Sequence, residues 1–330
     1  LHIHGANGFD TMDANEEAIH GMGRFLVRHG VTAYLPTTVT ASLEDTQAAI
    51  ANVRACPQPD DGAQHLGIHL EGPYLNPNFK GAQSLEFLRL PDPKDYSLWL
   101  TDGTVRLITL APELDGALEL IDAGVKAGIE FAVGHSGANY GQVTTAAERG
   151  LRQASHLFNG MIELHHRFPG VVGAVLMDQR ITPQLIVDGV HLHQVIVDMV
   201  QKLKGATNTI LITDAIRAVG LVDGEYTLGD QKVYVQNGIA RTENGNLAGS
   251  TLTMIRALKN VIAFTGISLP KAITMASTAP AYALGLRGKK GVLLEGADAD
   301  LIFLNQDFDV CLTMVGGKVV FKKEPQADKN

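Results

Sequence analysis

Eight short apolar runs alternate with longer helix-like stretches along this chain of 330 residues. The run at Thr209–Thr213 is almost continuously apolar, which is typical of a parallel strand buried on both faces. The eight runs are Leu1–Gly5, Val31–Val39, His65–Gly72, Val105–Pro112, Glu130–Ser136, Arg152–Asn159, Thr182–His191 and Thr209–Ala215. Eight strands separated by helices predict a (β/α)8 barrel of the TIM type, an α/β fold.

Helix signals occupy the stretches between the runs. Ala14–Gly30 has apolar residues at roughly helical spacing and stops at a glycine, and Ser42 is a suitable N-cap for Ser42–Ala55. Similar patterns occur at Asp115–Gly128, Tyr140–Gly150 and Leu192–Leu203. The alternative fold is an open doubly wound sheet. That fold favours a glycine-rich phosphate loop after a strand, and neither GxGxxG nor GxxxxGK[ST] occurs here.

Two segments do not fit a bare barrel. Asp223–Gly245 is turn-rich and alternating, which predicts a hairpin insertion at about 221–246 after the eighth strand. Gly291–Lys322 contains short strand-like runs joined by glycine turns. The expected organisation is a catalytic barrel over 1–288 and part of a small C-terminal β subdomain over 289–330.

Composition restricts the function classes. Hydrophobic residues make up 45% of the chain, which is enough for a sizeable core. The net charge is −8 without a long Lys/Arg run, which disfavours nucleic acid or an anionic membrane as partner. Cys56 and Cys311 are too few for a disulfide framework, so we expect a reducing, cytoplasmic location. No apolar window reaches the length of a transmembrane helix, so we expect no membrane span.

Polar and ionisable side chains end several of the predicted strands. In a barrel of this type, the strand ends meet at one face, where active sites lie. Charged groups and imidazoles beside apolar runs are costly unless they are paired or ligated. The residues concerned are His2, His4, Glu71, His135, His156, His191 and Asp214.

These residues have the chemistry of a metal centre. Glu71, His135 and His156 form a two-histidine, one-carboxylate set, which is a common catalytic zinc pattern. His2 and His4 lie on the same side of one strand, because side chains alternate with period two. Taken singly, each of these residues is better explained by packing or capping, so the prediction depends on the whole set.

Other residues fit a substrate. Asp214 could accept a proton from a water at the metal and pass it to a leaving group; a structural ion pair is the alternative. Asn159 and Gly160, followed by Arg167, could hold an anionic group, although a solvated basic patch explains them equally well. His191 is a candidate for a hydrogen bond to substrate.

Nine segments in order carry a resemblance that covers nearly the whole chain. They are His2–Gly5, His69–Tyr74, Leu110–Glu113, Gly134–Ser136, His156–Asn159, His165–Gly170, Asp188–His191, Thr213–Ala215 and Leu247–Ser250. The chain resembles the N-acetylglucosamine-6-phosphate deacetylases of the amidohydrolase superfamily. This resemblance implies hydrolysis of the acetamide of N-acetylglucosamine 6-phosphate to glucosamine 6-phosphate and acetate.

The resemblance also implies roles for single residues. Glu71, His135 and His156 would hold the main metal, and His2 with His4 would allow a second one. Zinc is the first choice, with iron, cobalt or manganese as alternatives. Asp214 matches the catalytic aspartate. The positions matching substrate contacts are Gln83, Asn159, Gly160, Arg167, His191 and Leu247. A homodimer is implied, with the arginine stretch near the subunit interface.

Three departures from the family pattern bear on these roles. The family usually has Lys-Gly-Ala-His where this chain has Gln83, and glutamine donates a hydrogen bond but carries no proton. The family usually has Arg-Glu-Pro-Gly where this chain has Phe168. Members also carry an N-terminal strand segment ahead of the His-x-His pair, which pairs with the C-terminal β subdomain and which we expect to be missing here.

Three alternatives remain at this stage. Gln83 keeps open a deacetylase for another N-acetyl amino sugar phosphate, such as the galactosamine epimer. A cyclic amidase of the same superfamily usually has a carboxylated lysine at the fourth strand end, where this chain has Thr109–Glu113 without a lysine. A non-catalytic barrel that binds a sugar phosphate is the third, and the intact set of ligand-type residues argues against it.

Overall fold

A parallel sheet of seven strands dominates the computed structural model, which describes residues 1–324. Its order is β11-β10-β9-β8-β7-β6-β4. The sheet curls until Ile3 forms parallel bridges to Pro36 on one side and to Ala215 on the other. The segment around Ile3 therefore fills the gap between the two edges of the sheet and closes the barrel. This closure confirms the predicted (β/α)8 fold and excludes the open sheet. The strands are β4 (Thr37–Thr38), β6 (Ile68–Glu71), β7 (Val105–Leu110), β8 (Glu130–Val133), β9 (Gln153–Ala154), β10 (Thr182–Ile186) and β11 (Ile210–Ile212).

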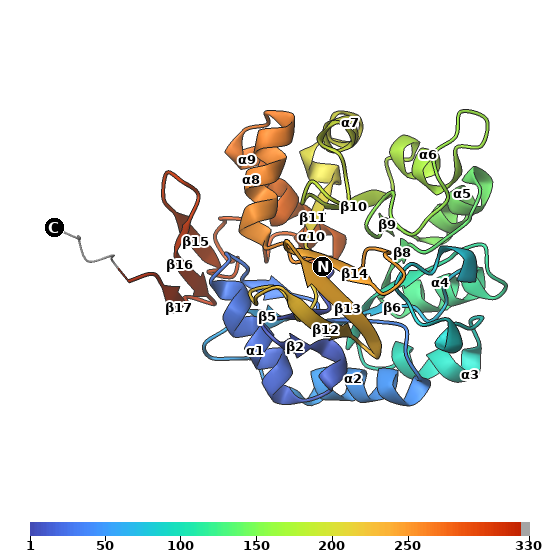
Figure 1. The fold of residues 1–330 in the computed structure, drawn as a ribbon, viewed down its shortest axis with the longest axis horizontal. Helices are drawn as coiled ribbons and strands as arrows, with labels where there is room; N and C mark the ends of the chain where they lie inside the picture. Colours follow the sequence, from blue (N-terminus) through green and yellow to red (C-terminus); the bar gives the residue numbers. More distant parts are fainter. Residues whose placement is uncertain (325–330) are drawn as a thin grey trace.

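Helices surround the sheet, as Figure 1 shows. Ser42 caps its helix as predicted, accepting a hydrogen bond from Asp45 N–H, and Gly150 ends α5 in the left-handed conformation. The first helix, α1, ends at Val27, three residues before the predicted stop at Gly30. Asn15 caps α1 through Ala18 N–H. The helices are α1 (Glu16–Val27), α2 (Leu43–Ala55), α3 (Pro93–Tyr96), α4 (Ala117–Lys126), α5 (Tyr140–Arg149), α6 (Gly170–Met177), α7 (Gln194–Lys204), α8 (Met254–Thr265), α9 (Leu269–Ala276) and α10 (Thr278–Ala283).

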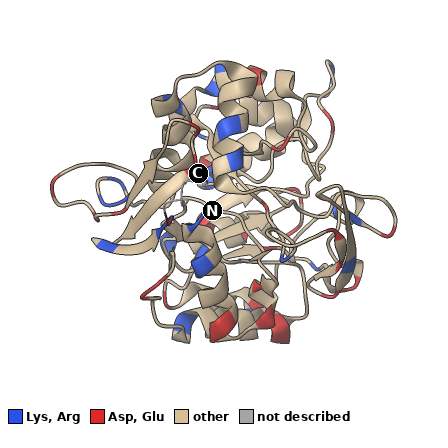
Figure 2. Ribbon diagram, turned by 60° about the vertical axis from the view of Figure 1, so that its left-hand side comes forward, with Lys and Arg blue, Asp and Glu red and all other residues tan. Residues whose placement is uncertain are grey.

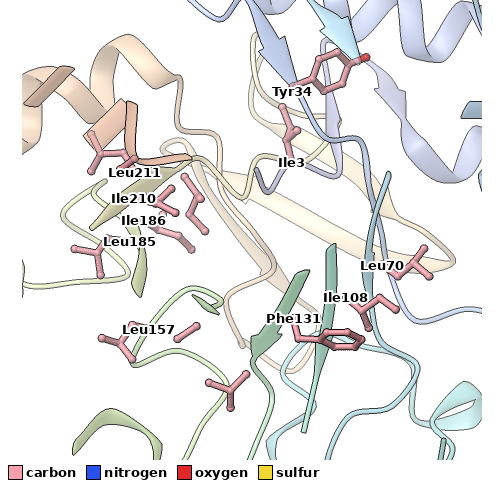
Figure 3. Close-up of a cluster of buried hydrophobic side chains, with 14 of the residues drawn as sticks. Ile3, Tyr34, Leu70, Ile108, Phe131, Leu157, Leu185, Ile186, Ile210 and Leu211 are labelled. Atoms are coloured by element: carbon pink, nitrogen blue, oxygen red, sulfur yellow. The ribbon is translucent and has the colours of Figure 1, made fainter. Parts of the chain in front are cut away.

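The core lies between the sheet and this ring of helices. Figure 3 shows side chains from successive barrel strands, including Ile108 on β7, Phe131 on β8 and Ile186 on β10. These three side chains are fully buried. Phe131 packs so closely on α4 that a Cβ at Gly124 would lie 2.4 Å from its ring. Such burial stabilises the fold by about 1.5–3 kcal/mol for each large apolar side chain.

A small antiparallel sheet follows the barrel's last strand. It contains β12 (Gly224–Leu228), β13 (Gln231–Gln236) and β14 (Ile239–Thr242), so the expected hairpin has a third strand. The sheet has its own small core, in which Leu228, Val233 and Val235 pack with Val39 and Ile216 of the barrel. This contact fixes the insertion against the barrel.

A second antiparallel sheet forms the C-terminal β subdomain (Figure 1). Its strands are β15 (Leu301–Leu304), β16 (Val310–Val315) and β17 (Lys318–Lys322). Thr313 Oγ1 donates to the carbonyl of Val27 at the end of α1, which ties the sheet to the barrel. Residues 325–330 of the segment predicted as subdomain lie outside the described residues.

Short elements complete the described chain. They are the strands β1 (Gly5–Ala6), β2 (Phe9–Asp10), β3 (Ala33–Tyr34) and β5 (Gln64–His65), and the 3-10 helices η1 (Thr11–Asp13), η2 (Pro77–Phe79), η3 (Leu85–Phe87), η4 (Ser97–Leu100) and η5 (Ala206–Asn208). Within residues 1–324, every helix is too short or too polar to cross a bilayer. Acidic and basic residues are interspersed over the helices and loops in Figure 2.

Candidate active site

The ligand-type residues meet at the carboxyl ends of the barrel strands. Glu71 is the last residue of β6, while His135, His156 and Asp214 each lie two residues beyond a strand end. These last three residues all have positive φ, at 49°, 30° and 49°. A side chain in this region costs about 1–3 kcal/mol, and such strain clusters at functional sites, where the surrounding structure maintains it.

Glu71 stands at the centre of the cluster, and its side chain is 2% exposed. Its Oε1 lies 2.8 Å from His156 Nε2, 3.2 Å from His135 Nε2 and 3.3 Å from His2 Nε2. Its Oε2 lies 3.4 Å from His4 Nε2. One carboxylate thus faces four imidazoles contributed by three different strands.

Asp214 faces the same space from β11. Its Oδ1 lies 3.1 Å from His4 Nε2 and 3.4 Å from His2 Nε2. The main chain adds to this contact, because Asp214 N–H donates to the carbonyl of His2. The first and eighth strands of the barrel therefore present their side chains jointly.

The imidazoles are turned so that Nε2 points to the centre. In three of the four rings the other nitrogen lies near a main-chain carbonyl: His4 Nδ1 is 3.2 Å from Thr37 O, His135 Nδ1 is 2.9 Å from Phe79 O, and His156 Nδ1 is 3.1 Å from Asn159 O. A protonated Nδ1 makes these contacts hydrogen bonds and leaves Nε2 with a lone pair. This orientation is characteristic of metal-ligating histidines.

The residues present fit a divalent metal. Two groups have ligand atoms all within 4.8 Å of one another: His2, Glu71 and His156, and His2, His4 and Asp214. Both ring nitrogens of His2 and Asp214 Oδ1 are buried without a hydrogen-bond partner among the described residues. Buried polar atoms without partners are rare in folded proteins. An ion held between these atoms would give His2 Nε2 and Asp214 Oδ1 the interaction they lack.

The electrostatics keep both carboxylates charged. Burial alone would raise the pKa of Glu71, but His2 and His135 hold it well below its usual range. Asp214 behaves in the same way, because His2 and His4 outweigh the effect of burial on its pKa. Burial and the neighbouring His2 hold the pKa of His69 well below its usual range, so His69 is a neutral ring.

His69 packs beneath the cluster. It is fully buried and lies edge-on to His2, with ring centroids 4.7 Å apart. Its Nε2 is 2.7 Å from Thr109 Oγ1, and its Nδ1 is 3.3 Å from Thr37 Oγ1. Both nitrogens are therefore used within the barrel.

A cleft of about 560 Å³ opens over the cluster. Among the residues expected to contact substrate, Asn159, Gly160, His191 and Leu247 line it. The ring of His191 is oriented by Asp188, whose Oδ2 lies 2.7 Å from His191 Nδ1. The cleft is also lined by residues that sequence reasoning did not select, such as Lys80 of the loop after β6 and Asn246 of the insertion.

Two predicted substrate contacts have other surroundings. Gln83 lines the cleft, but its Nε2 donates to Glu71 Oε2 at 2.6 Å and its Oε1 accepts from Thr40 N–H at 2.7 Å. Both ends of the amide are thus engaged within the protein. Arg167 does not line the cleft; it lies on an exposed loop, with its guanidinium 2.8 Å from His166 Nε2.

Glu113 is a polar residue near the site that the sequence analysis did not select as a site residue. Glu113 follows β7 and binds the loop that begins at Ser136, directly after His135. The available signal was its position, because it is an acidic residue just past the end of a barrel strand, as the ligand candidates are.

Comparisons with known proteins agree with this geometry. The model of the amidohydrolase family matches residues 1–320. An N-acetylglucosamine-6-phosphate deacetylase of Vibrio furnissii is 40% identical over 97% of this chain and 81% of its own. An N-acetylgalactosamine-6-phosphate deacetylase of Escherichia coli O157:H7 is 38% identical over 96% of this chain and 85% of its own.

A solved structure gives the same result in three dimensions. A variant of the N-acetyl-D-glucosamine-6-phosphate deacetylase of Mycobacterium smegmatis, in complex with N-acetyl-D-glucosamine-6-phosphate, superimposes with a TM-score of 0.91. It is 36% identical, and the match covers 97% of this chain and 84% of that one. The family expected from the sequence motifs is confirmed. This chain belongs to the amidohydrolase family.

Proposed function

We propose that this protein is a metal-dependent deacetylase that hydrolyses N-acetylglucosamine 6-phosphate to glucosamine 6-phosphate and acetate. The observation that carries the proposal is the convergence of four imidazoles and two buried carboxylates at the floor of one cleft. The substrate class comes from the relatives, which are deacetylases of N-acetyl amino sugar phosphates over nearly the whole chain.

Glu71, His135 and His156 would hold the main metal, and His2 with His4 would take part in a second position. His2 belongs to both groups of clustered donors, which supports one shared ion or two adjacent ions. Zinc is the first choice for this donor set, with iron, cobalt or manganese as alternatives. A divalent ion bound there would make a water more acidic and polarise the acetyl carbonyl.

Asp214 would move the proton. Its Oδ1 faces the cluster without a hydrogen-bond donor among the described residues, and its lowered pKa keeps the carboxyl group ionised, so it can accept a proton. It takes a proton from the attacking water as the water oxygen bonds to the acetyl carbon. It then gives this proton to the sugar nitrogen as the carbon–nitrogen bond breaks, because an amine leaves readily only when protonated. The carbon fragment leaves as acetate.

The cleft residues would position the sugar phosphate. His191, oriented by Asp188, presents its Nε2 as a contact for a sugar hydroxyl. Asn159, Gly160 and Leu247 supply main-chain and amide groups at the cleft wall. Gln83 donates a hydrogen bond to Glu71 in this arrangement. This bond supports a role in orienting the Glu71 carboxylate, instead of the substrate contact implied by the resemblance.

Arg167 would bind the phosphate from a partner subunit of a homodimer. Its exposed position outside the cleft of its own chain supports this assignment, as does the neighbouring residue Phe168, which is 68% exposed. Aromatic residues and Arg are enriched in the buried centres of protein–protein interfaces. The two free cysteines, Cys56 and Cys311, support a cytoplasmic location.

The galactosamine epimer is the second candidate substrate. It is favoured by the E. coli relative, whose identity to this chain is within two percentage points of that of the V. furnissii enzyme. The two sugars differ only in the configuration of one hydroxyl. A single hydrogen bond in the cleft would therefore decide between them.

Acetate release measured on the purified protein tests the proposal. The panel contains both N-acetyl hexosamine 6-phosphates and unphosphorylated N-acetylglucosamine, with metal content determined on the same sample. We expect one or two metals per chain and the highest kcat/KM with N-acetylglucosamine 6-phosphate. A higher kcat/KM with the galactosamine epimer would favour the second candidate. Bound metal without acetate from any of the three would overturn the proposal.

A further inference from the structure

Glu113 accepts hydrogen bonds from the loops on both sides of its own strand. Its Oε1 accepts from Gly137 N–H at 2.6 Å and from Asn76 Nδ2 at 2.9 Å, and its Oε2 accepts from Ser136 Oγ at 2.7 Å. Asn76 belongs to the loop after β6, and Ser136 and Gly137 follow β8. These strands flank β7 in the sheet. All three donors are neutral N–H or O–H groups, and bonds from such donors to a carboxylate are shorter and stronger than bonds between two neutral groups.

The three donors surround His135, one of the proposed metal ligands. Ser136 and Gly137 are the next two residues of the chain, and Asn76 N–H donates to the carbonyl of His135 at 2.9 Å. Three residues after Asn76, the carbonyl of Phe79 lies 2.9 Å from His135 Nδ1. Glu113 therefore joins the segment that carries His135 to the segment that orients its ring.

His135 depends on such support because its backbone is strained. Its φ of 49° is unfavourable for a residue with a side chain, and neighbouring contacts must maintain it. The region has little free space: a Cβ at Gly137 would lie 2.5 Å from the ring of Phe79. A small displacement of this segment would move the imidazole relative to Glu71.

The same carboxylate also stabilises the next loop indirectly. Ser136 N–H donates to the carbonyl of Gly160 at 3.1 Å, and Ile162 N–H donates to the carbonyl of Ser136 at 3.1 Å. Gly160 lines the cleft, and a Cβ there would lie 2.8 Å from His135 Nδ1. The position of Ser136 thus affects both His135 and the cleft wall.

We propose that Glu113 is a positioning residue that sets His135 in its metal-ligating orientation. It acts through Ser136, Gly137 and Asn76, and it touches neither the metal nor the substrate. This inference deepens the proposed function and rests on it. A glutamine at this position would keep most of the contacts, because its carbonyl oxygen can still accept from Gly137 and Asn76 while its amide donates to Ser136 Oγ.

Zinc affinity is the measurement that tests this proposal. It is obtained by titrating zinc into the metal-free protein against a competing chelator. For Glu113→Ala we expect a loss of about 10–100-fold in affinity, the usual effect of removing a residue that orients a metal ligand. Glu113→Gln should stay within about threefold of the wild type. The matched control is Asp115→Ala, which removes an exposed carboxylate from the same loop and should leave zinc affinity unchanged.

A purely structural role predicts a different pattern. It would lower the Tm of metal-free Glu113→Ala while zinc affinity stayed within about threefold of the wild type, and this result would overturn the proposal. If Glu113→Ala does not fold, Ser136→Ala provides the second test, because it removes one of the three bonds. That variant should lose several-fold in zinc affinity, and an unchanged affinity would also overturn the proposal.

Failure of the proposed function would look different from failure of this inference. A wild type that binds zinc but releases no acetate from either amino sugar phosphate overturns the function, and the affinity comparison still decides the role of Glu113. An active wild type with an unaffected Glu113→Ala overturns only the role of Glu113.

Discussion

Replacing Gln83 by alanine separates the role seen in the structure from the substrate contact implied by the family resemblance. The side chain is 5% exposed and connects two buried groups, the carboxylate of Glu71 and the N–H of Thr40. The reverse amide orientation would place oxygen against the carboxylate and NH2 against the N–H, so the bridge has one favourable orientation. Alanine removes both hydrogen bonds and offers no replacement donor to the carboxylate or acceptor to the N–H.

The magnitude follows from these two bonds. A hydrogen bond to a charged group contributes about 1.5–3 kcal/mol, and a buried N–H left without an acceptor costs about 1–3 kcal/mol. Solvent entering from the cleft offsets part of this loss, so we expect the free energy of unfolding to fall by about 3 kcal/mol. An unfolding entropy of about 2.1 cal/mol/K per residue over 330 residues converts this into a Tm lower by about 4–5 °C.

Scanning calorimetry on the metal-free protein is the assay, because bound metal would raise the Tm by mass action. Gln83→Met is the control that keeps most of the volume but has no amide, and it should lose nearly as much as alanine. If Gln83→Ala keeps its Tm within 1 °C and loses activity through a higher KM, the side chain serves the substrate. That result would refute the assignment to Glu71.

Three further changes test other parts of the site. Asp214→Asn should lower kcat by about 10²–10⁴-fold with metal content unchanged, as shown by acetate release and metal analysis, because the amide cannot accept the proton; retained activity would remove Asp214 from this role. Arg167→Ala should raise KM for the phosphorylated sugar alone in steady-state kinetics, and an equal effect on unphosphorylated N-acetylglucosamine would contradict the phosphate assignment. Gly160→Ala should weaken zinc binding and lower the Tm, because Gly160 has a φ of 61° and its new Cβ would meet the His135 ring; normal zinc affinity would show that the loop yields freely.

Much of the architecture could be predicted from the sequence, because strands, helices and caps depend on residues close together in the chain. The run at 209–213, the cap at Ser42 and the stop at Gly150 each need only a few neighbours to specify them. The period of two along a strand likewise placed His2 and His4 on one side before any tertiary contact was known. Eight such runs separated by helices also predicted a barrel, in which all of the runs become buried strands.

The tertiary structure decided which of these residues meet, because the contacts join distant parts of the chain. Only closure of the barrel through Ile3 brings His2 to Asp214, 212 positions later. The amide of Gln83 is engaged by Glu71 and Thr40, and no local pattern could reveal that both ends were used. The exposed position of Arg167 also depends on how its loop packs. Local sequence sets the conformation of each segment, while the curl and register of the sheet set the distances between them.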